Sequence, residues 1–289
     1  MFKKINFFKI ADDQPISADA LEKKLASHRF NRVGSQDMKS IGWAPVFTHG
    51  DLVHRLEGQW MIKLVTEERV LPGAVVKRMV AERAAEEERQ CGHKLGKKQL
   101  RDLKEAVLQE LRPKALCKMS EAHVWIDPVT GFIATDGKPD TVAEMILKAD
   151  ETFPIVRVNT VQSPSSAMTA WLLGDPPSEF TIDNECELKS IEGETVKYTN
   201  VNLDRKDIRD HISEGKYVTQ LALTHEDAIS FVMTQKFELK KLDYLGAGED
   251  GPSEDEDPVA LFDSAFAIMV GAIQPLYPAL IEALGGEAA

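Results

Sequence analysis

The chain has 289 residues and a formal net charge of -12, with 43% hydrophobic and 28% charged residues. This is the composition of an ordinary globular protein, long enough for one large domain or two to three small ones. The three cysteines, Cys91, Cys117 and Cys186, are far apart, which argues against a disulfide framework and against a Cys-rich zinc site. No apolar run reaches the roughly 20 residues of a membrane helix, so we expect a cytoplasmic protein without a membrane partner.

The first part of the chain predicts a strand, a short helix and a further strand. MFKKINFFKI alternates as a strand does. Ser17 is a typical N-cap, and Leu21 and Leu25 give the helix that follows one apolar stripe. The turn-rich segment 30–46 comes next, and QWMIKLVTEERVL, starting at Gln59, then alternates well enough for a strand or hairpin.

A helical hairpin is predicted from Pro72 onward. Helix formers fill residues 73–90, with Val76 and Val80 spaced for one face. Gly92 and Gly96 interrupt the helix, and a second helix follows from Lys97 to about Leu111, where Pro113 stops it. Two helices with a short glycine-bearing link form an αα-hairpin, and its length of about 35 residues suits a protrusion.

The segments after the hairpin alternate between strand and helix patterns. EAHVWIDPVTGFIAT predicts two strands with a tight turn, KPDTVAEMILKAD a helix and FPIVRVN a strand. Ser163 and Pro164 open a further helix, and GDPPSEF is typical of a linker. Four strand candidates then surround one helix, and they read FTIDNECELKS, ETVKYTNVNL, KYVTQLALTH and AISFVMTQ. The fold class expected is α+β, with mixed sheets and an inserted helical hairpin.

The C-terminal segment combines an acidic loop with an apolar helix. Residues 243–263 hold eight acidic and no basic side chains. GAGEDG in this segment matches G-x-G-x-x-G, but its carboxylates would repel a pyrophosphate, so we expect no dinucleotide cofactor. The apolar helix runs from about Pro258 to Leu284, and Pro275 and Pro278 are expected to kink or restart it.

Positive charge concentrates in the second half of the hairpin, HKLGKKQLRDLKEAVLQELRPKALCK, which has eight Lys or Arg and three acidic residues. On a helical wheel, Leu100, Leu103, Val107 and Leu111 share a sector of about 80°. A basic stripe adjoins this apolar stripe and contains Lys97, Arg101 and Lys104. Lys94 and Lys98 add charge near the hairpin tip, and Lys114 and Lys118 add charge near its foot.

Two interpretations of this basic stretch stay open. It is a solvated face, partly neutralised by the i,i+4 pairs Lys98–Asp102 and Arg101–Glu105, or it is an arm that contacts phosphates. The stretch contains no aromatic residue, which argues against stacking on single-stranded bases. It also lacks the pattern of a base-reading helix, so any duplex binding should be independent of sequence.

No segment carries a strong catalytic or metal signature. His49, Asp51 and His54 lie close together in THGDLVH, but a fourth ligand cannot be named, so solvated histidines are the simpler interpretation. Cys91 and Cys117 lack an obvious activating base. We therefore expect a protein that is not an enzyme and needs neither metal nor cofactor. A histidine- or metal-dependent nuclease using these three residues remains a third hypothesis.

Several motifs, in a consistent order along the whole chain, resemble the recombination-associated protein RdgC family. The most specific are GSQDM with the following GW, and LGGEA near the C-terminus; LASHRF, RVLPGAVVK, VWIDPVTGFI, ELKS, DHISEGKYVTQLAL and ISFVM agree with them. The resemblance implies a nucleoid-associated, sequence-independent duplex-DNA-binding homodimer, closed into a ring around DNA, that modulates RecA-dependent recombination. It also implies a central domain (1–71 plus 120–175), a helical tip (72–119) and a base domain (176–289).

The resemblance assigns roles to individual residues as well. Lys189 and Lys216 match positively charged family positions that would face the ring's hole, with Lys197 a weaker candidate. Leu116 would make the tip contact between subunits, and it replaces an aromatic residue found in some members. His93 stands where an arginine is expected. The alternative function is an interaction protein that acts on RecA directly, with DNA binding secondary.

Overall fold

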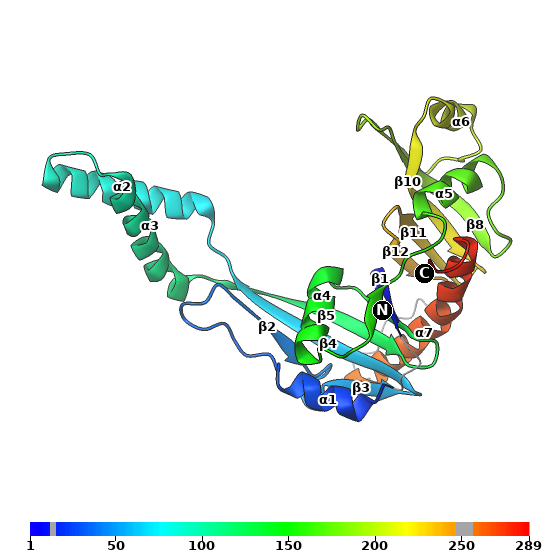
Figure 1. The fold of residues 1–289 in the computed structure, drawn as a ribbon, viewed down its shortest axis with the longest axis horizontal. Helices are drawn as coiled ribbons and strands as arrows, with labels where there is room; N and C mark the ends of the chain where they lie inside the picture. The colour runs from blue at the N-terminus through cyan, green and yellow to red at the C-terminus, as the bar shows by residue number, and fades with distance from the viewer. Residues whose placement is uncertain (12–15, 247–256, 289) are drawn as a thin grey trace.

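The chain forms an arch built on one large antiparallel sheet. The computed structural model describes residues 1–11, 16–246 and 257–288. Within them lie seven α-helices and a twelve-stranded sheet, so the predicted α+β class is confirmed. Figure 1 shows a helical hairpin at one end of the arch and the C-terminal strands at the other, with long strands running between them. The mixed sheets that we expected are instead a single sheet whose strand pairs are antiparallel.

The sheet joins both ends of the sequence. Its strand order is β2-β4-β5-β6-β1-β12-β11-β10-β8-β9, with β3 added to β4 and β7 added to β1. The N-terminal strand therefore lies in the middle, between β6 and β12. The strands are β1 (Lys4–Ile10), β2 (Lys39–Ala44), β3 (Val53–Leu56), β4 (Gln59–Arg69), β5 (Cys117–Asp127), β6 (Phe132–Thr135), β7 (Ile155–Arg157), β8 (Phe180–Lys189), β9 (Thr195–Thr199), β10 (Tyr217–His225), β11 (Ile229–Thr234) and β12 (Glu238–Tyr244).

Helices cover the sheet unevenly. On one face, α5, α6 and α7 bury a continuous core that includes Trp125 and Leu239 from opposite parts of the sheet. On the other face, α1 and α4 cover only the half of the sheet that runs from β2 to β1, around Trp43 and Ile126. The helices are α1 (Ala18–Ala26), α2 (Gly73–Cys91), α3 (Lys97–Leu111), α4 (Pro139–Ala149), α5 (Pro164–Leu173), α6 (Lys206–Ser213) and α7 (Pro258–Ala283).

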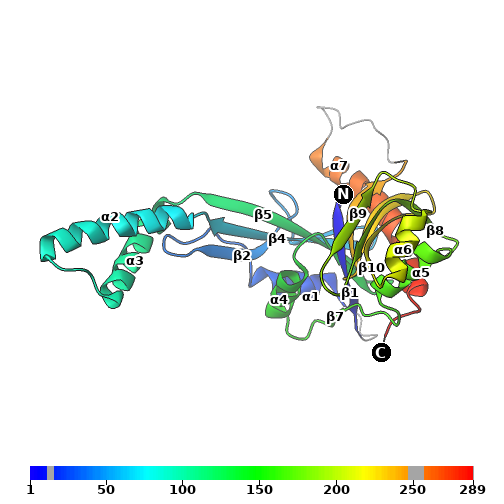
Figure 2. The same ribbon diagram turned by 90° about the horizontal axis from the view of Figure 1, so that it is seen from above.

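No helix of the described residues covers the second face of β8–β12, and we call it the helix-free face. Side chains of this face alternate along the strands with core side chains of the opposite face. They include Lys189, Lys197, Ala222, Val232 and Lys240. In Figures 1 and 2, α5 and α6 lie on the outer side of these strands, so the helix-free face looks along the arch toward the hairpin. An antiparallel sheet tolerates one solvated face because its side chains alternate between the two sides.

Helix α7 has almost the bounds that the sequence predicted. Pro275 and Pro278 lie inside one helix of 26 residues, so the helix does not restart at either proline. By length and composition it is the one helix among the described residues apolar enough to cross a membrane, with a mean hydropathy of 1.7. This corrects the expectation that no such run exists. Its buried side chains, including Phe266, Ile273 and Leu280, belong to the core beneath the sheet.

Strands β4 and β5 hold the hairpin at the end of a long ladder. They pair without interruption from Trp60↔Ile126 to Arg69↔Cys117. The first residues of β5, from Cys117 to Glu121, are exposed, so the ladder continues beyond the core. Strand β5 thus begins at Cys117, inside the segment 72–119 that we assigned to the tip. Most of the predicted acidic loop, including all of GAGEDG except Gly246, lies outside the described residues.

Candidate nucleic-acid interface

The helical hairpin forms as predicted and has a small core of its own. Val80, Ala84, Leu95 and Leu103 pack together between α2 and α3. Gly92 ends α2 with a φ of 73°, a left-handed conformation that glycine adopts without strain. Beyond it, the Glu88 side chain accepts a hydrogen bond from the backbone N–H of Leu95 at 2.9 Å. These contacts fix the direction of α3 relative to α2.

The predicted apolar stripe of α3 is only partly buried. Leu103 and Val107 are buried, whereas Leu100 is 37% exposed and Leu111 is half-buried. The stripe therefore packs against α2 over about two turns of helix. The neighbouring basic stripe faces solvent, since Lys97, Arg101 and Lys104 are all exposed.

Four of the predicted hairpin lysines have no carboxylate partner among the described residues. Within the described part of the chain, no carboxylate oxygen lies within 4 Å of the Nζ atoms of Lys94, Lys97, Lys98 and Lys104. The i,i+4 pairs that we expected are absent from these ranges. Arg101 lies 3.9 Å from Asp102, and Glu105 instead pairs with Arg112 at 3.3 Å. The local charge of the hairpin tip is consequently more positive than it would be if the expected i,i+4 ion pairs had formed.

Charges at the foot of the hairpin are more fully paired. Glu110 binds Arg83 and also Lys114, the latter at 3.0 Å. The hydrogen bond from Arg83, and then that from Lys114, hold the pKa of the Glu110 carboxyl below its usual range. Lys118 is exposed on β5, opposite Glu68 in the strand register. Lys114 and Lys118 are both predicted to contact DNA, and the ammonium group of Lys118 is the less closely paired with a carboxylate.

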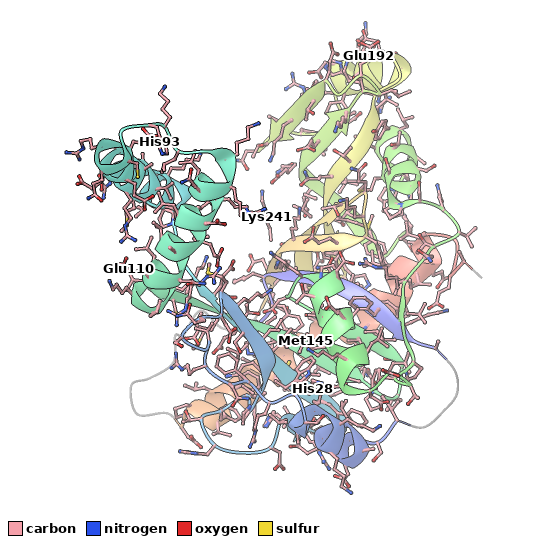
Figure 3. The ribbon with its side chains drawn as sticks, turned by 60° about the vertical axis from the view of Figure 1, so that its left-hand side comes forward. His28, His93, Glu110, Met145, Glu192 and Lys241 are labelled. Atoms are coloured by element: carbon pink, nitrogen blue, oxygen red, sulfur yellow. The ribbon has the colours of Figure 1, made fainter. Side chains whose placement is uncertain are left out.

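Exposed apolar side chains lie near these charges. Leu116 is 82% exposed, and its carbonyl accepts a hydrogen bond from the backbone N–H of Val70 at 2.8 Å. Val70 and Met119 are also well exposed. His93, at the outer end of the hairpin in Figure 3, is exposed, and its ring contacts only the neighbouring Lys94 carbonyl among the described residues.

The three predicted lysines of the C-terminal region differ in accessibility. Lys189, on β8, is half-buried, and no carboxylate oxygen of the described ranges lies within 4 Å of its ammonium group. Lys197, on β9, is exposed and lies 3.6 Å from Glu185. The Lys216 side chain is only 10% exposed and lies 3.5 Å from Glu214, so it is the least available of the three. Whether any of them contacts DNA stays a prediction.

The sequence-based predictions missed further lysines on the same side of the sheet. Lys4 and Lys240 are directly opposite each other in the β1–β12 register. Lys241 projects toward the hairpin from β12, as Figure 3 shows. Lys4 also lines a groove of about 260 Å³ beside the start of α4, together with Lys39 and Lys138. The sequence could have indicated Lys4, because it alternates with Ile5 in the first strand. The pairing of β1 with β12, which brings Lys4 opposite Lys240, could not be predicted from the sequence.

The histidine cluster is not assembled as a metal site. His49, Asp51 and His54 line one hollow of about 420 Å³. Nε2 of His54 lies 2.7 Å from the Asp263 carboxylate on α7, and its ring packs edge-on against Phe262. Among the described residues, no group of three or more His, Cys, Asp or Glu side chains is arranged to hold a metal ion. His54 instead ties the β3–β4 hairpin to α7.

Sequence comparisons place the chain in a family. The family model described as "Putative exonuclease, RdgC" matches residues 1–287. The chain belongs to the RdgC family. A "Recombination-associated protein RdgC" of Cupriavidus necator is 41% identical, covering 99% of this chain and 98% of its own length. The protein of the same name from Herminiimonas arsenicoxydans is 39% identical, covering 100% and 99%, and that from Burkholderia cenocepacia is 36% identical, covering 99% and 96%.

Membership in the RdgC family confirms the resemblance drawn from GSQDM, GW and LGGEA. The names of the relatives associate them with recombination, and the family description names an exonuclease. Neither says which residues of this chain act. The assignment of individual lysines to DNA and of Leu116 to a subunit contact therefore stays a prediction.

Proposed function

We propose that this RdgC-family chain is a non-enzymatic, sequence-independent duplex-DNA-binding protein that acts as a ring-shaped homodimer in the bacterial nucleoid. The observation that carries the proposal is the arrangement of charge at the two ends of the arch. Exposed lysines of the hairpin lie at one end, and the lysine-bearing helix-free face of β8–β12 looks toward them from the other.

Electrostatics makes this arrangement suitable for a duplex despite the net charge of -12. A polyanion responds to charges within a Debye length, about 8 Å at physiological salt, so the local face matters more than the total charge. Duplex DNA is about 20 Å wide and is held by several lysines through phosphate contacts and counterion release. Lysines without base-reading partners favour binding that is independent of sequence.

A ring requires two copies of the arch. The exposed apolar side chains of Leu116 and Val70, which lie opposite each other at the foot of the hairpin, favour a contact between two tips. We propose a second contact between the two C-terminal regions, which correspond to residues 176–289. Closure around DNA would slow its escape without any contact to bases. A protein that occupies duplex DNA in this way limits access by RecA, which gives the proposed role in recombination.

The proposal is tested by charge reversal at the hairpin. Replacing Lys97, Lys98 and Arg101 together by glutamate should weaken binding of every duplex sequence to a similar extent. The log-log dependence of affinity on salt should become less steep by about 0.9 for each phosphate that the variant no longer neutralises. Fluorescence anisotropy with two unrelated duplexes, at four or more salt concentrations, measures both quantities.

A matched control keeps the total charge change equal. Lys23, Lys24 and Lys148 lie on α1 and α4, and glutamate at these positions changes the net charge by the same amount. We expect this variant to retain most of its affinity, because its charges are far from the hairpin (Figure 1). Equal binding by the hairpin variant and the wild type would remove the hairpin from the DNA surface. A flat salt dependence with inhibition of RecA retained would favour a direct protein interaction instead.

The family description favours one competing function, an exonuclease. Its candidate residues in this chain are His49, Asp51 and His54, which line one hollow. Incubation of linear duplex DNA with Mg²⁺ or Mn²⁺ distinguishes the two functions. Degradation from the ends that is lost in His54→Ala would establish the enzyme, whereas binding without degradation in both metals would favour the proposal.

A further inference from the structure

One carboxylate on the helix-free face holds two lysines at once. Glu185, on β8, accepts a hydrogen bond from Nζ of Lys241 at 2.6 Å and lies 3.6 Å from Nζ of Lys197. The Glu185 side chain is 14% exposed, whereas those of Lys241 and Lys197 are 61% and 51% exposed. The carboxylate therefore lies beneath two ammonium groups that face solvent.

Lys241 reaches Glu185 across two intervening strands. β11 and β10 separate β12 from β8, and in a flat sheet strands three apart would lie about 14 Å from each other. Irregularities in the β11–β12 and β10–β8 registers accompany strong curvature here. Lys241 itself has a φ of 53°, a left-handed conformation that lysine rarely adopts. Val232 and Ala222 are buried on this face although no helix covers them.

The other acidic side chains of β8 have different partners. Asp183 accepts a hydrogen bond from the Thr224 hydroxyl at 2.9 Å, and Glu187 accepts one from the Thr219 hydroxyl at 2.8 Å. Hydrogen bonding from Lys241, the largest cause, lowers the pKa of Glu185, which therefore stays ionised at neutral pH. Within the described ranges, Glu185 is thus the β8 carboxylate that neutralises lysines of the helix-free face.

We propose that Glu185 sets the strength with which the helix-free face binds the DNA backbone, by holding Lys197 and Lys241 away from phosphate. This inference rests on the proposed function and adds a regulating residue to it. A lysine already paired with a fixed carboxylate brings little net charge to DNA, so fewer counterions are released when it approaches a phosphate. The face then binds duplex more weakly than its number of lysines alone would predict.

The test compares Glu185→Gln with Asp183→Asn. Both substitutions remove one negative charge from β8, but only the first releases lysines. Glu185→Gln should bind a duplex several-fold more tightly at 100 mM salt, and its log-log salt slope should be steeper by about 1 to 2, since each added phosphate contact contributes about 0.9. Asp183→Asn should produce only a small gain and leave the slope nearly unchanged. Equal behaviour of the two variants would overturn the proposal.

Single lysine variants test the same idea even if Glu185→Gln does not fold. Lys241→Gln in the otherwise unchanged chain should change the salt slope less than Lys189→Gln, because a lysine held by Glu185 neutralises no phosphate. Where Glu185→Gln folds, adding Lys241→Gln to it should reverse about half of the gain. A change of slope with Lys241→Gln as large as that with Lys189→Gln would contradict the proposal. Wild-type binding with a clear salt slope, combined with that result, would leave the proposed function standing.

Discussion

Gln274 of α7 donates a hydrogen bond to Oδ2 of Asp127 at 2.9 Å, and this contact joins the core helix to the turn between β5 and β6. Asp127 has no exposed surface. Its other oxygen, Oδ1, accepts the backbone N–H groups of Val129 and Thr130. A buried carboxylate is tolerated when hydrogen bonds satisfy it, and here three donors do so. The DPVTG turn therefore carries its aspartate for structural reasons.

Asp127→Ala should lower the free energy of unfolding by about 3 kcal/mol, because it leaves buried donors without an acceptor. Asp127→Asn should cost less, since an amide oxygen can still accept the two turn N–H groups. Urea unfolding followed by circular dichroism measures the difference. Equal midpoints for Asp127→Ala and the wild type would show that the turn is held by other contacts.

Gly42 is expected to tolerate no side chain. A Cβ built at this position would lie 2.6 Å from the Cα atom of Phe30, which is backbone and cannot rotate away. Gly42→Ala should therefore destabilise the fold by about 2 kcal/mol or more. Gly73→Ala is the control, because nothing lies within 4 Å of a Cβ there, and alanine at a helix position is neutral or stabilising. Thermal unfolding of both variants measures the difference in stability. A Gly42→Ala variant as stable as the wild type would contradict the prediction.

Glu67 should make stability depend on pH in the acid range. This buried side chain accepts the backbone N–H of Val33 at 2.7 Å and pairs with Arg32 at 2.8 Å. The hydrogen bond from Val33, followed by that from Arg32, lowers the pKa of Glu67 in the folded state. A carboxyl with a lowered folded pKa stabilises the fold above its unfolded pKa, about 4.3, and loses that contribution as pH falls through the folded pKa.

Glu67→Gln should consequently be less stable than the wild type at pH 7, with the gap narrowing below about pH 4. Glu68→Gln is the matched control, because Glu68 is exposed and neighbours Glu67 on the same strand. Urea midpoints at pH 7, 5, 4 and 3.5 follow the gap. A gap that stays constant over this range would show that the titration of Glu67 is not coupled to folding.

Local signals predicted the hairpin well because its boundaries are set by neighbouring residues. Gly92 adopts the left-handed cap, α3 begins at Lys97 as predicted, and a 3₁₀ turn replaces the α-helix around Pro113. The wheel likewise placed Leu103 and Val107 on the packed side. Propensity and periodicity act over a few residues, so they suffice for an αα-hairpin.

The single sheet was not predictable from the same signals. β12, with the sequence ELKKLDY, has two adjacent lysines and a weak alternation, and its partner β1 lies at the other end of the chain. Ion pairs of the candidate site also depend on the three-dimensional structure.

Glu105 pairs with Arg112 and not with Arg101, because Arg112 lies nearer to it in the folded chain. The Glu185–Lys241 contact required the curvature of four strands.

Leu116 provides the test of the proposed contact between two tips. Its side chain is 82% exposed, so Leu116→Asp should leave the folding of one chain unchanged. If two copies bury this leucine against each other, its removal costs the dimer about 1.5 to 3 kcal/mol and raises the dimer dissociation constant roughly 10- to 100-fold. Val129→Asp, at an 81% exposed position in the β5–β6 turn, is the control. Sedimentation velocity over a range of concentrations measures both variants, and an unchanged constant for Leu116→Asp would place the subunit contact elsewhere on the chain.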